Sequence, residues 1–205
     1  MSSPTAAFYF DLASPLAYLA AERVLHVLPG PAEWRPVLAT ELTIAGQHQQ
    51  GQQAADVQRL EIERRARELD LQPIRWPQPF PFDSSLAMRV ATYAASIGRT
   101  VPFVQAAFRQ AFAGGHSLED PDFVLIAAAA CEMHPAAVLR GAEMRSTAAR
   151  LAEATATAAG LGVTDVPAIV VGESVFVGET ALELAASHMR DVATATRPSQ
   201  RSRQE

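Results

Sequence analysis

The sequence predicts an α/β fold in which one sheet is assembled from both ends of the chain and a helical insertion lies between them. Residues 1–40 follow a strand–helix–strand pattern, and residues 163–192 follow a strand–strand–helix pattern. Residues 41–162 are rich in Ala and contain few β-branched runs, which favours helices. We therefore predict a four-stranded domain from the two ends, an all-helical insertion domain over 41–162, and a flexible tail over 193–205.

The amino-terminal unit opens with the apolar run AAFYF at residues 6–10, which is typical of a short strand covered on both faces. After a polar break at 11–15, apolar residues recur on one helical face over 16–28, and a Pro-Gly-Pro sequence ends this helix. The next strand, predicted over 34–38, contains Pro36. Because proline has no N–H for a ladder bond, we place this strand at an edge of the sheet.

The insertion begins with a charged helix, predicted over residues 53–70. A proline-rich segment at 73–81 then predicts an extended connector. Beyond the connector, capping residues and prolines predict the starts of four further helices. These starts are at Asp83 or Ser84, at Thr100, at Asp120-Pro121 and at His134-Pro135.

Two short strands are predicted near the carboxyl end. They are AIVV at 168–171 and SVFV at 174–177, separated by Gly172-Glu173. A two-residue loop with glycine first predicts a type II′ hairpin. A last helix is predicted over residues 179–189.

The composition excludes several classes of protein. One cysteine in 205 residues rules out an internal disulfide framework, a four-cysteine metal site and a two-cysteine redox motif. With 17 Lys+Arg against 22 Asp+Glu and no basic stripe, the chain is not expected to bind nucleic acid. The sequence contains no apolar run of about 18 residues, so we expect no membrane-spanning helix. The histidines are not spaced as metal ligands are. The amino terminus lacks a basic region, so we expect no signal peptide and a cytoplasmic location.

Ser14 is the first candidate for chemistry, because it lies between the first strand and the first helix and is followed by Pro15. Backbone N–H groups and the helix dipole at that position favour negative charge. A hydroxyl placed there can donate to an anion such as a thiolate and lower the pKa of the thiol. Ser14 can equally be an ordinary helix N-cap.

Pro167 is the second candidate, because it follows Val166 directly before a strand. A cis bond there leaves the Val166 N–H and C=O free to pair with an extended ligand. An ordinary trans proline that starts a strand is the alternative.

Together these features resemble the thioredoxin fold, in which a site at the first helix faces a cis-proline loop, and the helical insertion resembles its DsbA-like branch. Four segments narrow the resemblance to the 2-hydroxychromene-2-carboxylate isomerases and the related kappa-class glutathione transferases. They are FYFDLASPLAYLAAERV (8–24), FPFDSSLAMRVATYA (80–94), GHSLEDPDFVLIAAA (115–129) and GLGVTDVPAIVVGESVFVGETAL (160–182).

The resemblance implies a thiol-dependent isomerase that acts on an aromatic, conjugated small-molecule substrate, with glutathione or another low-molecular-weight thiol as cofactor. It implies that Ser14 replaces a nucleophilic cysteine and stabilises the cofactor thiolate, and that Val166 and Pro167 bind the cysteinyl part. Ala17 stands at the second cysteine position, so disulfide exchange by the protein is not expected. A homodimer is expected from the resemblance alone.

The end of the site that would bind the rest of the thiol compound departs from the family pattern. Gln47 stands where the family has Asn, and Thr180 and Ala181 replace an Asp-Arg pair near the γ-glutamyl group. Glu179 is a candidate substitute, as an anion beside an ammonium group. These departures leave open that the protein uses a different thiol, or that it is a non-catalytic member of the family.

Four aromatic side chains are candidates for an apolar substrate pocket: Tyr18, Trp76, Phe80 and Phe82. The last three lie in the proline-rich connector and would serve equally well as its packing anchors, and Tyr18 would serve in core packing. Cys131, in an Ala-rich helix, is expected to be a small buried hydrophobe.

Three functions remain in view. The leading one is an isomerase of the 2-hydroxychromene-2-carboxylate isomerase type. A kappa-like transferase that conjugates the thiol to an electrophile is the second. A non-redox, DsbA-like module that binds a ligand or peptide across Val166-Pro167 is the third, and it alone predicts no binding of a low-molecular-weight thiol.

Overall fold

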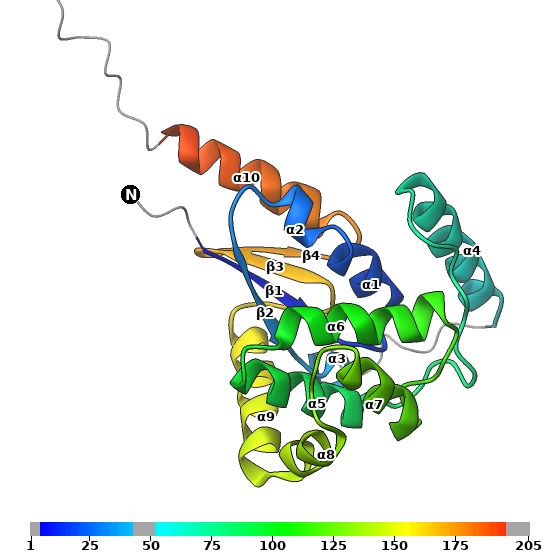
Figure 1. Ribbon diagram of the computed structural model, residues 1–205. Coiled ribbons are helices and arrows are strands. Elements are labelled where there is room, and N and C mark those ends of the chain that lie inside the picture. Colours follow the sequence, from blue (N-terminus) through cyan, green and yellow to red (C-terminus); the bar gives the residue numbers. More distant parts are fainter. Residues whose placement is uncertain (1–4, 43–51, 196–205) are drawn as a thin grey trace, which may run out of the picture.

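The computed structural model describes residues 5–42 and 52–195, and these form a four-stranded mixed sheet flanked by helices (Figure 1). The strand order is β2-β1-β3-β4. β1 (Ala6–Phe10) pairs in parallel with β2 (Ala32–Pro36) and antiparallel with β3 (Ala168–Val171), and β4 (Ser174–Val177) is antiparallel to β3. The predicted fold is confirmed, because the sheet joins both ends of the chain.

Between β2 and β3 the described residues form helices joined by loops, as predicted. They are α3 (Ala39–Leu42), α4 (Gln52–Glu68), α5 (Ser85–Ser96), α6 (Thr100–Phe108) with its π-helical continuation η1 (Arg109–Ala113), α7 (Pro121–Ala129), α8 (Pro135–Glu143) and α9 (Arg145–Gly160). Around the sheet lie α1 (Pro15–Ala21), α2 (Val24–Val27) and α10 (Ala181–Ala195). In Figure 1, α1, α2 and α10 lie above the sheet and α9 lies below its β2 side.

Several element boundaries differ from the prediction. The helix expected over 16–28 is broken after α1, where Glu22 pairs with Arg109 and Arg23 pairs with Glu183, so the turn is tied to two other elements. β2 lies two residues earlier than predicted, because the Leu38 N–H donates to Thr155 Oγ1 at 3.0 Å and so leaves the ladder. The last helix runs on to Ala195.

The edge position of β2 and the β3–β4 hairpin were both predicted from the sequence. β2, which ends in Pro36, lies at an edge of the sheet. The β3–β4 hairpin turns at Gly172, whose φ of 60° is the positive value that the first position of a type II′ turn requires.

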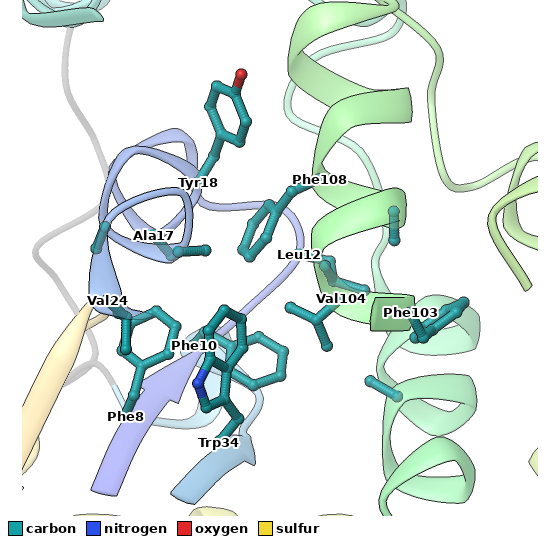
Figure 2. Close-up of a cluster of buried hydrophobic side chains, with 14 of the residues drawn as sticks. Phe8, Phe10, Leu12, Ala17, Tyr18, Val24, Trp34, Phe103, Val104 and Phe108 are labelled. Atoms are coloured by element: carbon teal, nitrogen blue, oxygen red, sulfur yellow. The ribbon is translucent and has the colours of Figure 1, made fainter. Parts of the chain in front are cut away.

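The core covers both faces of the sheet, because side chains alternate along β1. Phe8 and Phe10 pack with Trp34 and α6 on one face (Figure 2). Tyr9 packs on the other face with Val37 and with residues from α9 and the loop before β3.

Replacing Phe10 with Ala tests this packing. Phe10 is fully buried, and its ring lies 6.1 Å from the rings of both Trp34 and Phe108, measured between centroids. Because the truncation leaves a cavity between sheet and helix, we expect urea unfolding to show a loss of about 3–5 kcal/mol. Leu184→Ala, at a half-exposed position of α10, is the control and should change stability by less than about 0.5 kcal/mol. A Phe10→Ala loss as small as the control's would contradict this account.

Candidate functional site

Ser14 is the N-cap of α1, and Pro15 is the first helical residue. The backbone of Ser14 is extended, with φ −91° and ψ 114°, and its Oγ accepts a hydrogen bond from the Ala17 N–H at 3.2 Å. The side chain is half-buried and so keeps access to solvent.

The hydroxyl of Ser14 also joins the two regions that the sequence singles out. Its Oγ donates to the main-chain oxygen of Val166 at 3.3 Å, across 152 residues of sequence. The Val166–Pro167 peptide bond is cis. The structure therefore brings the predicted serine and the predicted proline loop into direct contact.

The main chain of Val166 is not free, and this corrects one expectation. Its C=O accepts from Ser14, and its N–H donates to the Asp165 carboxylate at 2.7 Å. The residue is buried, so polar groups beside it supply the hydrogen bonds that water does not. A ligand that pairs with this strand end must replace these partners.

Asp11 is a buried polar residue beside the site, in the candidate segment 11–15, to which the sequence analysis gave no role. Its side-chain oxygens accept from the Ala13 N–H at 2.9 Å, from Ser84 Oγ at 2.7 Å and from the Ala39 N–H at 3.0 Å. Burial raises the pKa of Asp11, and these three hydrogen bonds act against that rise. A lone acidic residue at the end of an apolar strand, three residues before Ser14, is the signal that could have found it.

At the predicted peptide-binding end of the site, Glu179 is already paired within the protein. Glu179 forms an ion pair with Arg65 of α4, with 3.2 Å between Oε1 and Nε. Thr180 is exposed in the turn before α10, and Gln47 lies outside the described residues. The cavity beside Glu179 is lined by residues of α1, α4 and α10 and measures about 10 Å³, which is roughly the space of one water.

The four predicted pocket residues lie in one aromatic cluster, in which Phe112 contacts the rings of Tyr18, Trp76 and Phe80. Trp76 and Phe80 have ring centroids 5.0 Å apart, and Phe80 and Phe82 lie 6.3 Å apart. Tyr18 stacks on Phe112 at 5.7 Å, and in Figure 2 its hydroxyl points away from Phe10 and Trp34. Phe82 and Tyr18 are buried, whereas Trp76 and Phe80 are half-buried and keep part of their rings accessible.

Helix α4 rests on the accessible part of this cluster. The guanidinium of Arg59 lies over the rings of Trp76 and Phe80, 5.3 and 5.5 Å from their centroids. The indole N–H of Trp76 donates to Glu63 at 2.7 Å. With the Arg65–Glu179 pair, these contacts hold α4 across the connector and the start of α10.

Other features of the described residues lie apart from this site. A hollow of about 420 Å³ runs along the outer edge of β2 between α5 and α9, and none of the predicted site residues lines it. Cys131 is buried and free, as expected, and burial raises the pKa of its thiol. Within residues 5–42 and 52–195, no three His, Cys, Asp or Glu side chains are grouped to hold a metal, and no helix has the length and apolar content to cross a membrane.

A family model described as the DSBA-like thioredoxin domain matches residues 5–190. The chain therefore belongs to this family. No curated protein matches the sequence.

Several solved structures share the fold. A 2-hydroxychromene-2-carboxylate isomerase superposes with a TM-score of 0.83 at 18% identity, over 93% of this chain and 97% of the other. A probable DsbA oxidoreductase from Streptomyces coelicolor gives 0.73 at 16%, over 95% and 92%. The cytosolic disulfide reductase DsbM from Pseudomonas aeruginosa, solved with GSH, gives 0.64 at 12%, over 93% and 98%. At these identities the likeness shows the fold alone.

Alkaline titration tests the burial of Tyr18. Burial, with Glu22 as a second cause, raises the pKa of Tyr18 to about 12. The neutral phenol therefore favours the folded state below the unfolded value of about 10, and this advantage is lost as the pH rises through about 12. We expect Tyr18→Phe to remove a phenolate absorbance step near pH 12. A step that survives the substitution, or an equal loss on Tyr93→Phe, would contradict the assignment.

Proposed function

We propose that this protein is a thiol-dependent isomerase of the 2-hydroxychromene-2-carboxylate isomerase type, in which Ser14 stabilises the thiolate of a low-molecular-weight thiol. One observation carries the proposal: the Ser14 hydroxyl lies 3.3 Å from the Val166 oxygen, so a hydroxyl donor and a main-chain acceptor lie side by side at the start of α1. The similarity in fold to a 2-hydroxychromene-2-carboxylate isomerase supports it.

The hydroxyl of Ser14 has a single proton, and this decides how the site would work. In the structure the proton points to the Val166 oxygen, while the Oγ lone pairs accept from Ala17. To stabilise a thiolate, the hydroxyl must turn its proton to the sulfur. An amide N–H on the thiol compound can then take its place at Val166, so thiols with an amide beside the cysteinyl carbon, such as glutathione, fit better than simple thiols.

The sulfur end of the site fits such a thiol, because Ser14 is half-buried and carries a donor that can reorient. A bound thiolate would supply a nucleophile that adds reversibly to a conjugated substrate. Ser14 would hold that negative charge, and the Val166 oxygen would orient the compound through its amide. An aromatic substrate that contacts Trp76 and Phe80 would displace the Arg59 guanidinium that lies over their rings.

The far end of the site supports a further proposal about the thiol. The Glu179 carboxylate is held by Arg65, and an ammonium group that binds Glu179 must compete with that guanidinium. Glutathione would therefore bind through its cysteinyl part more than through its γ-glutamyl end. We place this activity in the cytoplasm, where small thiols stay reduced.

Thiol titration of wild type and of Ser14→Ala tests the proposal. We expect wild type to bind glutathione saturably and to ionise it, seen as thiolate ultraviolet absorbance, at a pH below that of the free thiol. Losing the donor should lower kcat/KM on 2-hydroxychromene-2-carboxylate about a hundredfold. Ser96→Ala, which removes an exposed hydroxyl from α5, is the control and should match wild type.

Each alternative function gives its own result. Formation of a stable thiol adduct with an aryl halide, and no isomerisation, would indicate a transferase. An absence of thiol binding in wild type would leave the ligand-binding module and would contradict the proposal.

A further inference from the structure

The carboxylate of Asp11 lies where three segments of the chain meet. It is 3% exposed, at the end of β1. Oδ1 accepts from Ala13 in the loop before α1 and from Ser84 at the N-cap position of α5, and Oδ2 accepts from Ala39, the first residue of α3. The side chain thus joins the loop before α1 to the start of α3 and to the start of α5.

The same residue also fixes Ser14 through the backbone. The Ser14 N–H donates to the Asp11 main-chain oxygen at 3.0 Å, and Ala13 between them is held by Oδ1. Both the main chain and the side chain of Asp11 therefore define the path of the loop that ends at Ser14.

A buried carboxylate requires such donors, since an unpaired one is costly. Burial raises the pKa of Asp11, and repulsion from the neighbouring Asp83 carboxylate raises it further. Asp83 itself accepts from the Ser85 N–H at 2.8 Å, at the start of α5. The three donors are what keep the Asp11 carboxylate in this place.

We propose that Asp11 is the positioning residue of this site: its carboxylate holds the loop so that Ser14 Oγ stays between the Ala17 N–H and the Val166 oxygen. Its effect on a bound thiol rests on the function proposed above. Its effect on Ser14 does not, because the Ala17 N–H reports the place of Oγ without any ligand.

Four substitutions separate position from charge. Asp11→Ala removes all three acceptor contacts. Asp11→Asn can keep its amide oxygen at Ala13 and Ser84, and replaces the acceptor of the Ala39 N–H with an NH₂ donor. Asp11→Glu keeps the charge but displaces it by one methylene, and it serves if Asp11→Ala does not fold. Asp83→Asn is the matched control, since it removes a nearby charge that makes no contact with the loop before α1.

The first readout is hydrogen exchange of the Ala17 amide, measured by NMR relative to Val170 in β3 to correct for global stability. We expect Asp11→Ala and Asp11→Glu to accelerate it about tenfold, as the loss of one hydrogen bond does. Asp11→Asn and Asp83→Asn should stay within about twofold of wild type. Ser14→Ala, which removes the acceptor itself, is the positive control.

The second readout is the pKa of glutathione bound to each variant. We expect it to rise by about one unit in Asp11→Ala and to be restored in Asp11→Asn. Unchanged Ala17 exchange in both Asp11→Ala and Asp11→Glu would overturn the positioning role. A lowered melting temperature with no change in bound-thiol pKa would reduce Asp11 to a structural residue. If wild type ionises no thiol, the proposed function fails, and the Ala17 exchange still decides the role of Asp11.

Discussion

The pairing of β1 with β3 is the constraint on which the rest of the structure depends. It joins residues near the two ends of the chain in an antiparallel ladder from Ala6↔Val171 to Tyr9↔Ala168. Because the loop before α1 follows β1 and the cis-proline loop precedes β3, this one ladder sets Ser14 against Val166. Closing so long a loop costs chain entropy, which the buried aromatic packing of β1 on α6 offsets.

Much of this architecture was predictable, because it follows from local chemistry. The apolar run of β1 predicts a buried strand, the proline that ends β2 predicts an edge strand, and the glycine of the β3–β4 turn predicts a hairpin. The structure has all three features. The contact of Ser14 with the proline loop was predictable only through a family resemblance, since 152 residues separate the two and no local pattern reports such a distance.

The parts that sequence reasoning missed are those decided by partners distant in the chain. Nothing near Glu179 in the sequence indicates that Arg65 pairs with it, and nothing near Val166 indicates that its main-chain oxygen accepts from Ser14. Two of the three donors to Asp11, Ser84 and the Ala39 N–H, are likewise distant in the chain. The mutual packing of the connector's aromatic residues, with Arg59 over them, emerges only from the fold.

The central claim is that the Ser14 site holds a thiol as its thiolate, and proton release tests it most directly. Calorimetric titration of the wild-type protein with glutathione near neutral pH, repeated in buffers of different ionisation enthalpy, counts the protons released on binding. Because the free thiol is mostly protonated at that pH, the account predicts release of nearly one proton per thiol bound. Saturable binding with no proton release would contradict it.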